Sequence, residues 1–191
     1  MVTKITEAFS VSDVQIMDGV QTFEEAAASS DGTDIYGVRN ASLEADVGDY
    51  DNVGDDAILA SWRWFNKAVL NVVAGYISFD TLAAITGDTV ASSGSGANVA
   101  FGFDLWNETH MNVAPAPVLL KCPAKDSEGT VRNLLIGLYK VQFGPLQITG
   151  PAYKEGLTVS YVGTALMSLA DEVGTAITDK TVGRLISVAS A

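Results

Sequence analysis

The sequence predicts a mainly β fold, a β-sandwich or partial barrel with one short flanking α-helix and extended N- and C-terminal arms. Polar and apolar residues alternate along several segments, which is the signature of half-buried strands. Turn-forming Gly, Pro and Asp residues separate these segments. With 48% apolar and 18% charged residues, the chain can also build a core. We expect an N-terminal arm over residues 1–20, one sandwich domain over 21–170 and a C-terminal extension over 171–191.

The clearest alternation runs from Asn40 to Val47, with every even position polar and every odd position apolar. A second segment, from Ala57 to Ile77, has apolar residues at its even positions, interrupted only by Asn66. This segment is either one very long strand or two strands joined near Asn66-Lys67. Both interpretations stay open, because that dipeptide lacks the glycine that tight hairpins favour.

One short helix is predicted over residues 78–87. Ser78 can cap its N-terminus, and Asp80 lies in the first turn, where the helix dipole favours a carboxylate. Gly87 can adopt the left-handed conformation that ends many helices. The following segment, residues 92–96 (SSGSG), has the composition of a flexible loop.

The rest of the chain predicts further strands and an extended tail. The strands are expected at Val99–Trp106, Pro117–Cys122, Thr130–Phe143 and Leu157–Leu166. The tail begins at Asp171 and contains a short strand at Val182–Val188.

The charge of the chain is unevenly distributed. Residues 1–60 hold 13 of the 23 acidic residues but only two of the eleven bases, Lys4 and Arg39. The chain has no cluster of Lys and Arg, which argues against a protein that grips nucleic acid. It has no apolar run long enough to span a membrane, so no membrane insertion is expected. A single cysteine, Cys122, excludes an internal disulfide framework and suits a reducing cytoplasm.

The sequence offers little for catalysis, so we expect no enzyme, no cofactor and no metal site. Its one histidine, His110, lacks the partners of a catalytic triad, and Cys122 lies in an apolar strand typical of a small buried side chain. The acidic stretch 44–56 matches a calcium-binding EF-hand loop only in part. Val53 and Ala60 stand where ligands are required, so an acidic loop facing solvent or a partner is favoured.

The order of these features resembles the major tail proteins (tail tube proteins) of long-tailed, non-contractile bacteriophages. Three features carry the resemblance: a strand entering a Gly/Asp-rich loop (residues 48–56), long apolar strands leading to the helix phrase SFDTLAAITG (residues 78–87), and a final alternating strand (residues 156–166). The resemblance covers roughly residues 30–170. It rests on residue types and their order.

The resemblance implies a structural virion protein. In that family six copies form a ring whose inner sheets join around a lumen, and stacked rings form the tube through which the genome leaves the capsid. The implied partners are other copies of the chain, a tape measure protein and other tail proteins. Genomic DNA would pass without specific binding. The implied location is the phage tail, after assembly in the host cytoplasm.

Within this interpretation the sequence supplies candidate site residues. Glu44 and Asp46 share the polar face of one strand and are candidates for the lumen wall, where carboxylates would repel DNA; the alternative is that they face outside solvent. The other candidates fall into two sets. For ring stacking they are Ile5 and Phe9 in the arm Met1–Phe9, and Asp49, Tyr50, Asp51, Asp55 and Asp56 in the loop Asp46–Asp56; for core or subunit-interface anchors they are Trp62, Trp64, Leu82 and Ile85.

Two alternatives to the tail tube remain open. The chain could be another non-enzymatic virion sandwich, such as a capsid decoration protein. It could also be a binding module for Ca²⁺ or carbohydrate, with the ligand held by the acidic loop.

Overall fold

The computed structural model describes eight segments of the chain: residues 5–8, 11–29, 32–54, 57–76, 78–95, 99–103, 113–149 and 158–189. For residues 5–8, 50–54, 57–62 and 64 only the backbone is described. His110 and the predicted stacking residues Phe9, Asp55 and Asp56 lie outside the described residues.

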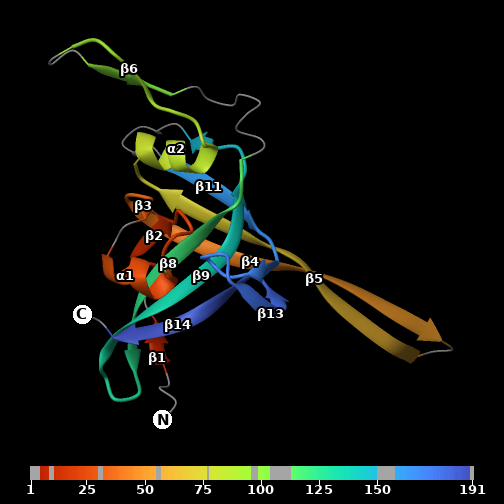
Figure 1. The fold of residues 1–191 in the computed structure, drawn as a ribbon. Helices are drawn as coiled ribbons and strands as arrows, with labels where there is room; N and C mark the ends of the chain where they lie inside the picture. Colours follow the sequence, from red (N-terminus) through yellow and green to blue (C-terminus); the bar gives the residue numbers. More distant parts are fainter. Residues whose placement is uncertain are drawn as a thin grey trace.

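Ten strands form one large antiparallel sheet, which confirms the predicted β fold (Figure 1). The strands hydrogen-bond in the order β3-β2-β8-β9-β11-β5-β4, with β1 beside β8, β10 beside β11 and β14 beside β9. In chain order these strands are β1 (Ile5–Ala8), β2 (Asp13–Ile16), β3 (Thr33–Asp34), β4 (Val38–Gly54), β5 (Ala57–Ala74), β8 (Ala116–Asp126), β9 (Val131–Phe143), β10 (Gln147–Thr149), β11 (Thr158–Ala165) and β14 (Gly183–Ala189).

The sheet folds over itself, so that its two halves enclose the main core. Leu70 and Val72 of β5 and Val159 of β11 pack in one cluster with Val118 of β8 and Val14 of β2, and all five side chains are fully buried. Burial of this apolar surface is the main stabilising contribution of the fold. The molecule is therefore a sandwich whose halves are joined through β9 and β11.

Residues 57–74, in which the apolar alternation is interrupted at Asn66, form a single strand, β5. β5 pairs with β4 along its whole length, and the register passes from Asp46 opposite Lys67 to Val47 opposite Phe65. Asn66 is thus the extra residue of a β-bulge, which explains why the apolar alternation breaks at this position. The predicted acidic loop is corrected by the same pairing, because residues 46–54 continue β4 as an extended strand.

Helix α2 (Phe79–Thr86) confirms the predicted helix together with both of its caps. The Ser78 hydroxyl accepts a hydrogen bond from the Thr81 amide, and Gly87 is left-handed with a φ of 70°. Leu82 and Ile85 are buried in the main core, so this helix closes one end of the sandwich.

A second helix, α1 (Phe23–Ser29), was not predicted, and the structure therefore has two flanking helices instead of one. The N-terminus of this helix has a capping box, formed by Thr22 and Glu25. The Thr22 amide donates to Glu25 Oε2 at 3.0 Å, and the Glu25 amide donates to Thr22 Oγ1 at 3.3 Å. This helix packs on the outer face of the sheet over a second apolar cluster, formed by residues including Leu119, Leu135 and Tyr139.

The segments predicted as arms contribute strands to the sheet. Val14 and Ile16 of β2 are buried in the main core, although they lie within residues 1–20. At the other end, β14 pairs with β9 from Gly183 to Ala189, close to the predicted short strand. The buried Glu172 also places the start of the C-terminal segment within the fold.

Four short strands complete the structure. β6 (Ala91–Ser93) pairs with β7 (Ala100–Gly102), and β12 (Ser168–Ala170) pairs with β13 (Ala176–Thr181). The predicted loop over residues 92–96 is therefore partly a strand. Of the predicted strand Val99–Trp106, the described part is strand only from Ala100 to Gly102.

Asp126 stabilises the turn between β8 and β9. From its hydrogen bonds we predict how the stability of the fold changes at acid pH. Its carboxylate accepts hydrogen bonds from Arg132 and from the amides of Glu128 and Thr130. The bond from Arg132 in particular lowers the pKa of Asp126. The carboxylate therefore stabilises the fold above its unfolded pKa of about 3.9, and this contribution is lost as the pH falls through the lower folded pKa.

For Asp126→Asn we expect a lower stability near pH 7 than in the wild type and a flatter loss between about pH 5 and 2. Urea titrations at several pH values measure both. Parallel pH profiles for the two proteins would contradict the prediction.

Candidate self-assembly surface

The most distinctive feature of the fold is the hairpin of β4 and β5, which contain 17 and 18 residues. Figure 1 shows that its distal half leaves the body and projects away from the sandwich. Strands of this length are well above the usual range of about 3–10 residues, and among the described side chains of β5 none between the projecting end and Ala68 is fully buried. The projecting half is therefore available for contacts outside this chain.

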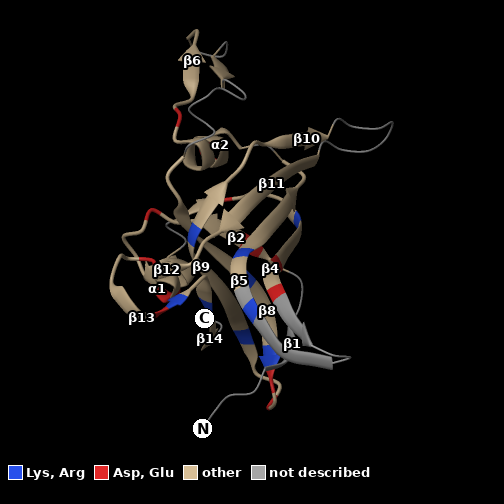
Figure 2. Ribbon diagram, turned by 90° about the vertical axis from the view of Figure 1, so that its right-hand side faces the viewer, with Lys and Arg blue, Asp and Glu red and all other residues tan. Residues whose placement is uncertain are grey.

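The exposed face of the hairpin carries opposite charges on its two strands. Glu44 and Asp46, the predicted lumen residues, are exposed on β4. Asp46 lies opposite Lys67 of β5 in the register, whereas Asp49, opposite Arg63, lies on the other face of the hairpin. Figure 2 shows the resulting red segment on β4 beside blue segments on β5. Cross-strand pairs of this kind stabilise a hairpin modestly and reduce its net negative charge.

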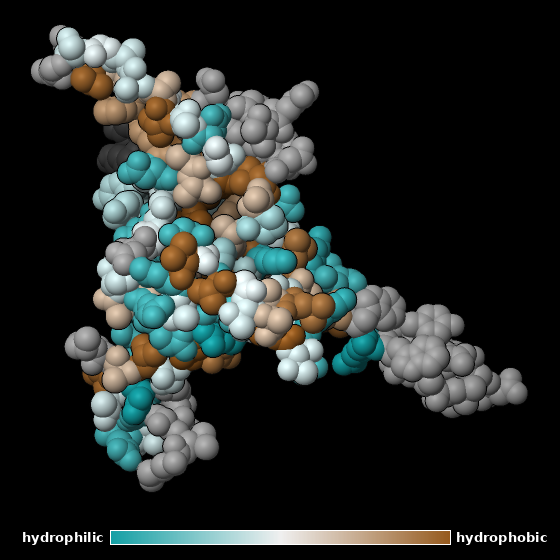
Figure 3. Space-filling model, in the orientation of Figure 1, coloured by the Kyte–Doolittle hydropathy of each residue, from teal (hydrophilic) through white to brown (hydrophobic). Residues whose placement is uncertain are grey.

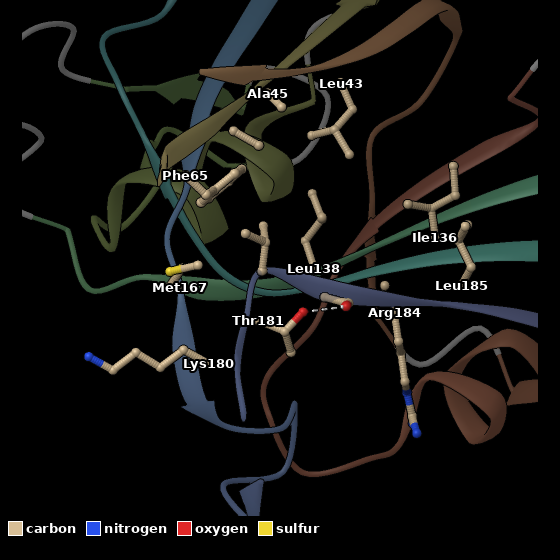
Figure 4. A pocket seen from close by; sticks show the side chains of 14 residues that line it. Leu43, Ala45, Phe65, Ile136, Leu138, Met167, Lys180, Thr181, Arg184 and Leu185 are labelled. Carbon is tan, nitrogen blue, oxygen red and sulfur yellow. Dashed lines mark hydrogen bonds between the residues drawn. The ribbon is translucent and has the colours of Figure 1, made fainter. Parts of the chain in front are cut away.

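The opposite face of the hairpin forms one wall of an apolar groove. Leu43, Ala45 and Phe65 lie on this wall, and the other wall is formed by Leu138 of β9 and Leu185 of β14. Figure 4 shows these side chains converging from the two sides. The groove has a volume of about 580 Å³ and is open to solvent.

The rim of the groove exposes large apolar side chains. Leu185 is 69% exposed, Met167 42% and Leu43 40%. Figure 3 shows hydrophobic residues gathered among hydrophilic ones on the body near the root of the hairpin. Contiguous exposed apolar surface is typical of sites that contact another protein or a ligand.

Two sheet edges border the groove. β4 is the last strand in the hydrogen-bonding order, and β14 pairs with β9 alone among the described strands. Each edge therefore presents backbone N–H and C=O groups that another strand could pair with. The arrangement is an incompletely closed sandwich with an apolar opening between its edges.

A second hollow, of about 600 Å³, lies at the far end of the molecule beside α2. Four aromatic side chains line it, and all are exposed by more than a third of their surface: Tyr36, Tyr76, Phe79 and Phe101. Phe101 comes from the β6–β7 hairpin, and its ring lies 6.5 Å from that of Phe79. This aromatic hollow is separate from the groove.

The predicted site residues are distributed over three environments. Glu44, Asp46 and Asp49 lie on the hairpin, as do Tyr50, Asp51, Trp62 and Trp64, whose side chains are outside the described part. Ile5 pairs with Asp126 at the other end of β8. Leu82 and Ile85 are core residues of a single chain. Sequence reasoning missed the groove, because its residues come from separate elements and no local pattern links them.

The remaining candidates for chemistry are Cys122 and the acidic side chains. Cys122 is buried, and this burial raises the pKa of its thiol. No group of three or more His, Cys, Asp or Glu side chains in the described segments is placed to hold a metal ion. None of the helices among these residues is both long and apolar enough to cross a membrane.

Comparison with known proteins adds no assignment. No protein family matches this chain. A search of curated proteins likewise finds no match.

Proposed function

We propose that this chain is a structural subunit that assembles with copies of itself into rings, and that the rings stack into a phage-type tail tube serving as a conduit for DNA. The observation that carries the proposal is the apolar groove between the two sheet edges, β4 and β14. An isolated subunit leaves both edges and the groove exposed, whereas a neighbouring subunit would cover them.

The geometry favours a head-to-tail contact. The groove and the projecting hairpin are different surfaces of the same chain, so contact between them on neighbouring copies is heterologous. Heterologous contacts that close by rotation generate rings. The hairpin supplies the reach to a neighbouring subunit or ring, and its backbone offers a free edge along β4.

The charge of the chain fits a conduit. The net charge is −12, and Glu44 and Asp46 are exposed. A lumen lined by such carboxylates would repel DNA at short range and limit adhesion during passage. Lys67 lies opposite Asp46, and Arg63 lies opposite Asp49, so these bases offset part of the negative charge. We therefore assign only part of the hairpin to the lumen wall.

Negative-stain microscopy and sedimentation of the purified full chain test the proposal, with rings or tubes as the expected species. The variant Leu185→Asp places a charge on the groove rim, where Leu185 is 69% exposed in one chain. If assembly buries this position, the charge should weaken each contact by about 3 kcal/mol, or about 100-fold.

The matched control is Val20→Asp. Val20 is 75% exposed and lies outside the groove, so this variant should assemble like the wild type. Circular dichroism checks that both variants fold. A wild-type chain that stays monomeric at all concentrations, with and without tail partner proteins, would refute self-assembly. Assembly that Leu185→Asp leaves unchanged would refute the groove as the contact.

A further inference from the structure

A small group of oxygen atoms lies on the outer face of the sheet, on strands β2 and β3. Asp13 and Gln15 are two residues apart on β2 and therefore point to the same face. Asp34 of β3 is the register partner of Gln15, so its side chain lies on that face too. Two adjacent strands thus bring together two carboxylates and one side-chain amide.

Two oxygen atoms of this group are buried without a hydrogen-bond partner. They are Oε1 of Gln15 and Oδ1 of Asp34. Gln15 is only 3% exposed. The Gln15 amide nitrogen donates to Asp13 Oδ2 at 3.0 Å, which holds the amide against the first carboxylate. Buried polar atoms are almost always paired, so two unpaired ones on register partners indicate a place where an ion or a water binds.

The charge balance favours an ion over a water molecule. Asp13 and Asp34 lie on the same face of adjacent strands, and two carboxylates so placed repel each other when both are charged. Lys121 lies opposite Asp13 on β8, but its ammonium group donates to the carbonyl oxygen of Ala27 at 3.2 Å. No salt bridge joins Lys121 to Asp13 in the part of the chain that the structure describes. A water could satisfy the two oxygen atoms but could not neutralise the two acids.

We propose that Asp13, Gln15 and Asp34 form a binding site for a hard divalent cation, with Ca²⁺ preferred. Carboxylate and amide oxygens are the ligands that Ca²⁺ takes in proteins, and its flexible coordination tolerates ligands from two strands with the remainder supplied by water. Mg²⁺ needs a more regular geometry and should bind more weakly. Such an ion would tie β3, and the start of β4 that follows it, to β2 at the end of the sheet.

Calorimetry and thermal unfolding of the full chain, stripped with a chelator and titrated with CaCl₂ or MgCl₂, test this site. We expect one Ca²⁺ per chain and a midpoint temperature that rises with the logarithm of the Ca²⁺ concentration. Asp34→Asn and Asp13→Asn should each weaken Ca²⁺ binding at least about tenfold, because each removes one ligand charge. The exposed Asp179→Asn, on β13, is the matched control and should bind like the wild type.

A second measurement guards against variants that merely unfold. Without Ca²⁺, Asp34→Asn should be as stable as the wild type or more stable, because it removes a like-charge contact with Asp13. Its stability should then be insensitive to Ca²⁺. Absence of heat and of a thermal shift in the wild type would overturn the proposal. So would binding that survives in Asp34→Asn but disappears in the hairpin variant Asp49→Asn/Asp51→Asn. Neither result depends on whether the chain forms rings.

Discussion

Replacing Phe23 by alanine is expected to destabilise the fold by about 4 kcal/mol, the largest single effect we predict. Phe23 is fully buried, and its ring stacks on Tyr139 with 5.8 Å between ring centroids. It also fills the space above Gly137, where a Cβ atom would lie 2.3 Å from the Phe23 ring. Alanine would leave a cavity between α1 and the sheet that the rigid strands β8 and β9 cannot close.

Urea denaturation followed by circular dichroism, at a concentration where the chain is monomeric, measures this loss. Phe79→Ala is the control, because Phe79 is 38% exposed at the start of the other helix and should cost less than about 1 kcal/mol. A comparably small loss in Phe23→Ala would mean that α1 does not pack on the sheet as described.

The second large effect is expected for Arg184→Met, at about 3 kcal/mol. Arg184 Nη2 donates to Glu172 Oε1 at 2.5 Å and to Glu24 Oε2 at 3.0 Å. The Glu172 side chain is only 1% exposed, and its Oε1 also accepts from the Phe23 amide. Removing the arginine leaves a buried carboxylate with an unbalanced charge. The free-energy cost of this buried charge is larger than the net stabilisation that the ion pair provides.

A double-mutant cycle separates the free energy of the lost contact from that of the unpaired buried charge. Arg184→Met/Glu172→Gln should recover most of the stability, since the buried group is then neutral and still accepts the Phe23 hydrogen bond. Glu24→Gln should change stability by less than about 0.5 kcal/mol, because Glu24 is 43% exposed. If the double variant is no more stable than Arg184→Met, the buried charge is not the cause.

These two predictions concern the same part of the molecule, in which the C-terminal segment meets helix α1. Arg184 and Glu172 belong to the C-terminal segment, and Phe23 and Glu24 belong to α1. The guanidinium of Arg184 also lies 5.6 Å from the centroid of the Phe23 ring. The C-terminal segment that the sequence suggested as an extension is thus fastened to α1 and, through β14, to the sheet.

Local patterns predicted much of the secondary structure. Strict alternation predicted β4 over residues 40–47, and Ser78 with Gly87 predicted both ends of α2. These signals are readable because period and capping depend on residues close in sequence. Helix α1 was missed although Thr22 and Glu25 form its capping box, because its seven residues are too few to establish an apolar period.

What the sequence determined by itself is the β class, the long apolar strands, the capped helix and the acidic first third of the chain. The interruption at Asn66 marked a discontinuity, but only the register showed that it is a bulge within one strand. Only the tertiary structure determines the apolar groove, the pairing of Glu172 with Arg184 and the pairing of Gln15 with Asp34. Each depends on which strands become neighbours, and that choice is made by burial of the whole core. The spacing of residues along the chain does not indicate which strands become neighbours.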